Sequence, residues 1–108
     1  MKFHKNLTIK RWRKLSTIEQ MANIGAEVGR TVNWRKKDKK ISQAAFWRAL
    51  ELFDATISDP KNKKSLKEIC RARELAVDYF AGENEYHSSD KFWQDYFYAF
   101  NYAARINR

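Results

Sequence analysis

The chain has 108 residues and a formal net charge of +9 at neutral pH, from 22 lysine or arginine and 13 aspartate or glutamate residues. Its length fits one domain, and 44% hydrophobic residues supply enough apolar material for one core, which argues against a disordered chain. One cysteine and two histidines exclude an intrachain disulfide framework and a cysteine-based zinc site, and we expect neither a metal nor a cofactor.

Residues 1–14 are predicted to form a basic N-terminal arm, separate from the domain of residues 15–108. The arm contains six lysine or arginine residues and no acidic residue, and its Leu7, Ile9 and Trp12 can pack back on the domain. Its spacing fits neither a regular helix nor a long strand. The arm lacks the apolar segment of a secretion signal, and no apolar run approaches the ~20 residues of a membrane span. We therefore expect a cytoplasmic protein with no membrane association.

The first helix is predicted to begin at Ser16, because the run from Ser16 to Glu19 has the pattern of a capping box. Apolar residues then recur at the three- and four-residue spacing of one helical face, as far as Val32. Gly25 and Gly29 lie on that face and lower helix stability by roughly 1 kcal/mol each relative to alanine. Their position predicts the close approach of a neighbouring helix.

A basic, solvated connection over residues 35–40 precedes a second helix, which we expect Ser42 to cap. Asp59 and Pro60 end this helix and begin a third, with Asp59 as the N-cap and Pro60 in the first helical position. The second helix has one broad apolar face made of two overlapping rows, Ala45, Ala49, Leu52 and Thr56, and Phe46, Leu50, Phe53 and Ile57.

The third helix is predicted to run to about Ala81, with Cys70 on its buried face, and Gly82 ends it. After a loop, Ser88 or Ser89 is expected to cap a fourth helix, whose stripe of aromatic residues and alanines we interpret as core. Glycine and proline are scarce, and no strand pattern is present. Four amphipathic helices with short links predict an all-α fold, an up-down antiparallel four-helix bundle with a basic N-terminal arm.

Catalysis is not expected, because no nucleophile has a base beside it in the predicted fold. Cys70 lies in a helix far from the loop that carries His87, and His4 lies on the arm. The HEPN ribonucleases, which are small helical bundles, use an arginine followed four to six residues later by a histidine. Residues 81–83, at that spacing before His87, include no arginine, so this motif is absent.

The four short-linked helices and net basic charge of residues 15–106 resemble two groups of small bacterial four-helix proteins. One group is encoded in intervening sequences of ribosomal RNA genes, and the other comprises the basic accessory proteins of diversity-generating retroelements. The resemblance implies an intracellular protein that is associated with nucleic acid and forms rings or other oligomers. It rests on no signature motif, so it assigns a role to no particular residue.

The positive charge is concentrated in three segments. Residues 1–14 carry +6, residues 33–42 carry +4 and residues 58–67 carry +3, so for a total of +9 the rest of the chain carries −4. In an up-down bundle the first and third segments share one end with the C-terminus, whereas the second lies beside the acidic loop before the fourth helix. The sequence therefore predicts one strongly basic end.

A basic end predicts a polyanionic partner, and we expect nucleic acid, RNA in particular, to be bound through its phosphates by a protein with a non-catalytic accessory role. Trp12 is expected to stack on a base. The alternative is a protein-interaction or homo-oligomerisation module with an acidic partner. The candidate contact residues are Lys10, Arg11, Trp12, Arg13, Lys14, Lys61, Lys63, Lys64, Lys67, Arg105 and Arg108.

Two further expectations concern single side chains. Arg73 falls at the centre of the apolar face of the third helix, so we expect it to be largely buried and bonded to a carboxylate or to backbone carbonyls. The alternative is an arginine at a loose helix seam whose charged end reaches water. Trp47, Tyr98 and Tyr102 lie outside the predicted core rows, which slightly favours a homo-oligomer.

Overall fold

Four long helices account for most of the chain. The computed structural model describes residues 2–4 and 7–106, and among these the class is all-helical apart from one short strand pair, which confirms the expected class. No helix in these residues is both long and apolar enough to cross a lipid bilayer. The long helices are α2 (Thr17–Trp34), α3 (Lys39–Ile57), α4 (Leu66–Ala81) and α5 (Asp90–Ile106).

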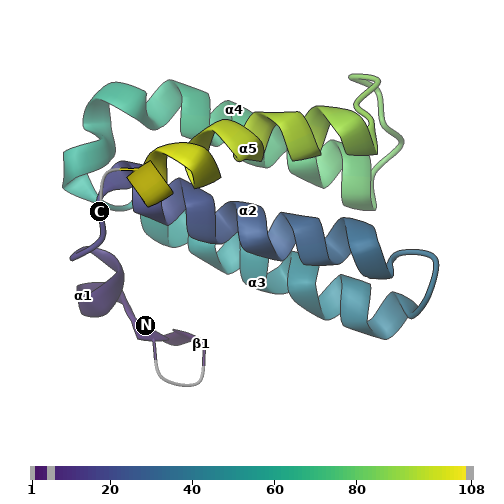
Figure 1. Ribbon diagram of the computed structural model, residues 1–108, viewed down its shortest axis with the longest axis horizontal. Coiled ribbons are helices and arrows are strands. Elements are labelled where there is room, and N and C mark those ends of the chain that lie inside the picture. Colours follow the sequence, from purple (N-terminus) through teal and green to yellow (C-terminus); the bar gives the residue numbers. More distant parts are fainter. Residues whose placement is uncertain (1, 5–6, 107–108) are drawn as a thin grey trace.

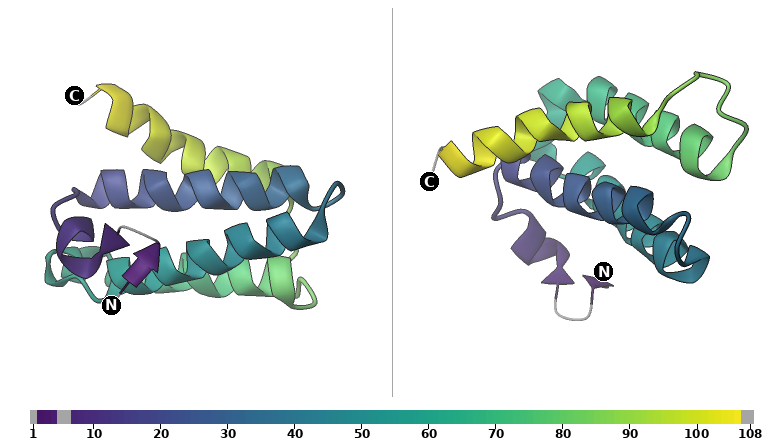
Figure 2. Two further views of the ribbon diagram at one scale, coloured as in Figure 1. Left: turned by 90° about the horizontal axis from the view of Figure 1, so that it is seen from below. Right: turned by 45° about the vertical axis from the view of Figure 1, so that its right-hand side comes forward.

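The helices α2 and α3 lie side by side, α5 packs on α2, and α4 packs on α3 (Figure 1). The α2–α3 link and the α4–α5 loop lie at one end of the molecule. The α3–α4 connection and the C-terminal end of α5 lie at the other end, together with the start of α2 (Figure 1). Towards its C-terminus α5 diverges from α2, so its last turns project from the molecule (Figure 2).

The N-terminal arm contains short regular elements. Strands β1 (Lys2–His4) and β2 (Leu7–Thr8) pair in antiparallel fashion and lead into a single helical turn, α1 (Ile9–Trp12). The expectation of no strand is therefore wrong for the arm. Trp12 is only 2% exposed and Ile9 is partly buried against the core, so these two residues do pack back on the domain.

Local capping signals set most of the helix boundaries. The Ser16 hydroxyl accepts from the Glu19 amide and the Glu19 carboxylate accepts from the Ser16 amide, which confirms the capping box. The cap of α3 is Asp38 rather than Ser42, because the Asp38 carboxylate accepts from the amides that open the helix one turn earlier. Ser42 is buried and donates to the Thr31 carbonyl at 2.8 Å.

The start of the third helical segment also follows its caps. Asp59 is the N-cap and Pro60 takes the first position, as predicted, but the first six residues form a 3₁₀ helix, η1 (Pro60–Ser65), before α4 begins. Gly82 is the C-cap of α4, and the Ser89 hydroxyl accepts from the Phe92 amide at the start of α5 at 3.1 Å.

The face by which α4 packs on α3 is narrower than its sequence indicates. Its buried residues are Ile69, Ala72 and Ala76, and Cys70 is exposed. The prediction of a buried Cys70 thiol is wrong. The contact stripe consists of Ile69 and two small alanines, and Cys70, the residue after Ile69, lies about 100° further around the helix and so outside the stripe.

The contact between α2 and α5 depends on Gly25. A Cβ atom at this position would lie 2.8 Å from the Cβ of Phe97, closer than side chains pack. Phe97 and Trp93 of α5 are both buried against α2. The predicted close approach is therefore confirmed at Gly25. It is absent at Gly29, where a Cβ atom would meet nothing within 4 Å.

Replacing Gly25 with alanine is expected to destabilise the protein by about 1–2 kcal/mol, because overpacking against Phe97 outweighs the gain in helix propensity. The matched control is Gly29→Ala, which has the same gain and open space, and which we expect to stabilise the protein by about 0.5–1 kcal/mol. Urea unfolding measures both changes. Equal stability of the two variants would contradict the close packing of α5 on α2.

Candidate nucleic-acid interface

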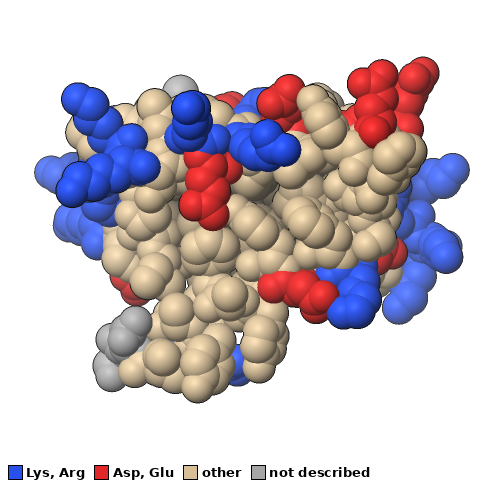
Figure 3. All heavy atoms as spheres, turned by 90° about the horizontal axis from the view of Figure 1, so that it is seen from above, with Lys and Arg blue, Asp and Glu red and all other residues tan. Residues whose placement is uncertain are grey.

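The basic residues predicted to contact nucleic acid gather at one end of the molecule. At this end the arm, the α3–η1 turn, the first turn of α4 and the end of α5 meet (Figure 1). In Figure 3, lysine and arginine gather at this left-hand end with few acidic side chains among them, whereas at the right-hand end lysine and arginine lie together with aspartate and glutamate. We call this surface the basic pole; it comprises Lys10, Arg11, Arg13, Lys14, Lys61, Lys63, Lys64, Lys67 and Arg105. Arg108 lies outside the described residues.

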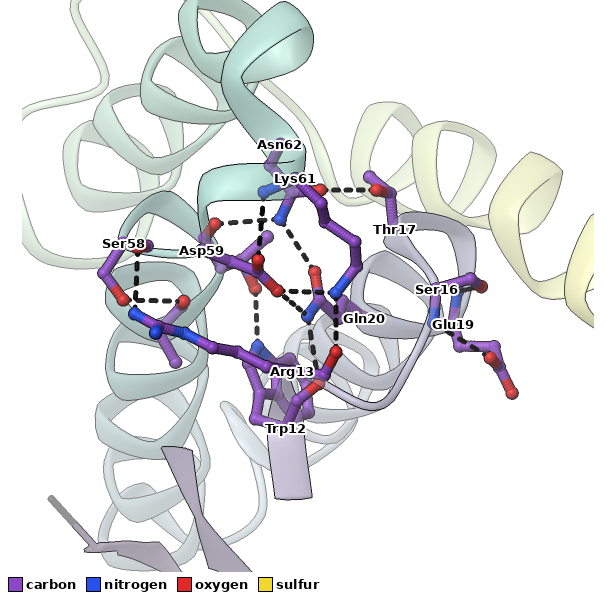
Figure 4. Close-up of polar contacts among 12 residues, drawn as sticks. Trp12, Arg13, Ser16, Thr17, Glu19, Gln20, Ser58, Asp59, Lys61 and Asn62 are labelled. Carbon is purple, nitrogen blue, oxygen red and sulfur yellow. Dashed lines mark hydrogen bonds and ion pairs between the residues drawn. The ribbon is translucent and has the colours of Figure 1, made fainter. Parts of the chain in front are cut away.

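Beneath the basic pole, buried side chains form a polar network centred on Gln20, which has no exposed surface. Its amide nitrogen donates to the Trp12 carbonyl at 3.0 Å and to the Asp59 carboxylate at 2.9 Å (Figure 4). Its amide oxygen accepts from Asn62 at 2.8 Å. One glutamine of α2 therefore holds the arm and the α3–η1 turn in place. The polar network comprises Trp12, Thr17, Gln20, Thr56, Asp59, Lys61 and Asn62.

Asn62 and Thr56 complete the connections between these elements. Asn62 also donates to the Thr56 carbonyl at 2.9 Å and accepts from the Thr17 hydroxyl. The Thr56 hydroxyl accepts from the Trp12 indole at 3.0 Å and donates to the Leu52 carbonyl at 2.8 Å. Because these bonds satisfy the buried amides, hydroxyls and indole of the network, the network adds rigidity at little desolvation cost.

Asp59 supplies the negative charge of the network. Its side chain is 5% exposed and accepts from the Lys61 ammonium at 2.6 Å as well as from Gln20. Burial alone raises the pKa of this carboxyl, but the hydrogen bonds from Lys61 and Gln20, together with the Lys61 charge, outweigh burial and lower the pKa below its ordinary 3.8. Asp59 is therefore ionised at neutral pH, and Lys61 is held against it.

The basic pole contains two kinds of cation. Lys61 also donates to the Arg13 carbonyl at 2.9 Å, and the Arg13 guanidinium donates to the Ser58 carbonyl at 3.0 Å, so both side chains hold the arm. A second set, all lysines, has exposed side chains that make no hydrogen bond or ion pair to any other described residue, which leaves their charges available to a ligand. This set is Lys10, Lys14, Lys63, Lys64 and Lys67.

The prediction that Trp12 stacks on a base is wrong. Its indole is 2% exposed and is hydrogen-bonded to Thr56 in the core. Burial of this large apolar ring stabilises the attachment of the arm, which exposure to a ligand would forfeit. The exposed aromatic rings near this pole are instead Tyr98 and Tyr102 of α5, 61% and 51% exposed.

Arg73 is bonded as predicted but is not largely buried. Its guanidinium donates to the two carboxylate oxygens of Asp54 at 2.8 and 3.4 Å. The Arg73 side chain is 33% exposed and that of Asp54 is 55% exposed. The arginine lies at the edge of the α3–α4 contact, where its charged end reaches a partner without leaving water.

The opposite end of the molecule carries charges of both signs (Figure 3). In the α2–α3 link, Arg35 lies over the rings of Tyr79 and Phe80 and is 3.5 Å from Asp90. Burial and the hydrogen bond to Asp90 raise the pKa of the Tyr79 hydroxyl. Among the described residues, no cluster of three or more His, Cys, Asp or Glu side chains could hold a metal ion.

The polar network was not predicted from the sequence. Gln20 lies off the predicted apolar face of α2 but four residues before the buried Ile24, and this spacing is the only signal that could have indicated a buried amide. Asn62 has no comparable signal, because it lies in a lysine-rich segment that reads as solvated.

Comparison with protein-family models, with curated proteins and with solved structures finds no match to the chain. The resemblance to the ribosomal RNA intervening-sequence proteins and to the retroelement accessory proteins therefore stays a prediction.

Proposed function

We propose that the protein binds nucleic acid, RNA in particular, through its phosphates at the basic pole, and that it serves as a non-catalytic accessory protein in the cytoplasm. The proposal includes the architecture that accounts for the pole, an up-down antiparallel four-helix bundle with a basic N-terminal arm. In such a bundle, segments far apart in sequence contribute cations to one end.

One observation carries this proposal. A buried, fully hydrogen-bonded polar network attaches the arm, with its lysines, to α2 and the α3–η1 turn. The side chains of five lysines of the basic pole have no partner among the described residues. Solubility alone requires neither this segregation nor this attachment. A rigid array of unpaired lysines suits a ligand with regularly spaced negative charges.

The salt dependence of binding tests the proposal. Neutralising about five phosphates is expected to give a slope of log affinity against log salt near −3.5 for single-stranded RNA and near −4.5 for duplex DNA. Between about 50 and 200 mM KCl the affinity for single strands should fall about 100-fold. Fluorescence anisotropy of a labelled 20-nucleotide RNA measures this slope. Binding that does not depend on salt, or no binding at 50 mM, would reject the proposal.

A further inference from the structure

A polar cleft lies beside the basic pole, between the first half of α2 and the last half of α5. Its volume is about 450 Å³, within the range of ligand sites. Glu19 and Asn23 line it from α2, and Tyr98, Asn101 and Arg105 line it from α5. The helices α2 and α5 diverge towards the end of the molecule that carries the basic pole (Figure 2), and the residues that line the cleft lie on these diverging parts.

An aromatic platform begins in this cleft with Tyr98 and continues outside its lining with Tyr102. Tyr98 and Tyr102 lie one helical turn apart, and their rings are nearly parallel, with an interplanar angle of 21° and centroids 6.4 Å apart. Both rings are more than half exposed. Exposed aromatic rings near a basic surface are elements by which proteins bind unpaired bases, and Arg105 lines the same cleft as Tyr98.

The polar side chains of the cleft complement a base and its phosphate. Asn101 is exposed and its amide makes no hydrogen bond to any other described residue, so it can both donate to and accept from the edge of a base. Arg105 is likewise exposed and without a described partner, and its guanidinium suits a phosphate. The Glu19 carboxylate, which accepts from the Ser16 amide, disfavours a phosphate beside it and can accept from an exocyclic amine.

We propose that this cleft takes one unpaired base of a single-stranded nucleic acid whose backbone follows the basic pole. The base stacks on Tyr98 and Tyr102, its edge meets Asn101, and the adjoining phosphate meets Arg105. This inference rests on the proposed function and narrows it, because the bases of a duplex are stacked on one another and cannot enter the cleft. A second copy of the chain is a poorer occupant, since it would bring another +9 charge to a basic surface.

The test compares a labelled single-stranded RNA with a duplex of the same length, by fluorescence anisotropy. The double variant Tyr98→Ala/Tyr102→Ala is expected to bind the single strand roughly tenfold or more weakly, with an unchanged salt slope, since no phosphate contact is removed. Its affinity for the duplex should not change. Tyr98→Phe/Tyr102→Phe keeps the rings and should bind as the wild type does. The control is Tyr86→Ala in the α4–α5 loop, which removes a ring that is 53% exposed at the opposite end.

Three results would overturn the inference. If the wild type binds both ligands equally and the double alanine variant matches it, the cleft takes no base, and the proposed function stands. If neither ligand binds at low salt, the proposed function fails and the inference fails with it. If the wild type is a dimer in light scattering and the alanine variant is a monomer, the tyrosines form an interface between copies. Far-ultraviolet circular dichroism confirms that each variant is folded.

Discussion

Replacing Asp59 with alanine is expected to destabilise the protein by about 2–4 kcal/mol. The substitution removes the acceptor for the buried Gln20 amide and for the Lys61 ammonium, and it also removes the N-cap of η1. A buried donor left unsatisfied costs about 1–3 kcal/mol, and the loss of a cap costs about 1 kcal/mol more. Urea unfolding measures the change in the free energy of unfolding.

Asp54→Ala provides a matched control, since Asp54 also accepts from a basic side chain, Arg73, and lies in the last turn of α3, five residues before Asp59. Its side chain is 55% exposed, so we expect a loss below about 1 kcal/mol. If Asp54→Ala and Asp59→Ala destabilised the protein equally, the polar network would not be what holds the arm.

Asp59→Ala should also change how the stability of the protein responds to acid. The pKa of Asp59 in the folded protein lies below its ordinary 3.8, so its carboxylate contributes stability above that pH, and the contribution is lost as the pH falls through the folded value. The difference in stability between the wild type and Asp59→Ala should therefore persist from pH 7 to about pH 4 and shrink below it.

Signals that act within one turn of the chain predicted the boundaries of the helices well. Ser16, Asp59, Gly82 and Ser89 each act through hydrogen bonds or backbone conformations of their immediate neighbours, and the structure has each at a helix end. The exception is the prediction that Ser42 caps α3. It is wrong because the Asp38 carboxylate, four residues earlier, accepts hydrogen bonds from the first backbone amides of the helix.

Features that depend on contacts between elements were less predictable. Cys70 and Arg73 both lie on an apolar spacing, and only the packing of α4 on α3 shows that the contact stripe runs along Ile69, Ala72 and Ala76 and leaves both residues to one side of it. Trp12 lies among lysines in the sequence, so its burial depends on partners more than forty residues away.

The sequence predicted where the positive charge of the candidate site gathers, but not which of its lysines are hydrogen-bonded. The gathering of residues 10–14 and 61–67 at one end (Figure 1) was predicted by counting helices, on the expectation that consecutive helices alternate in direction. The distinction between Lys61, which holds the arm, and Lys63, which is unpaired, depends on the position of Asp59 in three dimensions.

Replacing Lys10, Lys14, Lys63 and Lys64 together with glutamine is expected to weaken binding of single-stranded RNA roughly 30- to 150-fold, or about 2–3 kcal/mol in total. The side chains of these lysines are exposed and make no hydrogen bond or ion pair to another described residue, so their loss should not change the fold. The weakening should be the same for unrelated sequences, since phosphates carry no sequence information.

The matched control replaces Lys36, Lys37, Lys39 and Lys40 with glutamine. Both variants lose four lysines and both have a net charge of +5, four less than the +9 of the wild type. They differ in the end of the molecule that is changed, and the link variant also removes the contact of Lys37 with the Trp34 ring. The link variant should bind with nearly the affinity of the wild type, because its lysines lie at the end where acidic side chains also gather (Figure 3).

The salt dependence of RNA binding by these two variants tests most directly which end of the molecule binds nucleic acid. Each phosphate contact that is removed should flatten the slope of log affinity against log salt by about 0.7 for single strands. We expect a slope near −0.7 for the variant of the basic pole and a slope near −3.5 for the link variant. Equal slopes for the two variants, or a flatter slope for the link variant, would contradict the assignment of the basic pole as the nucleic-acid interface.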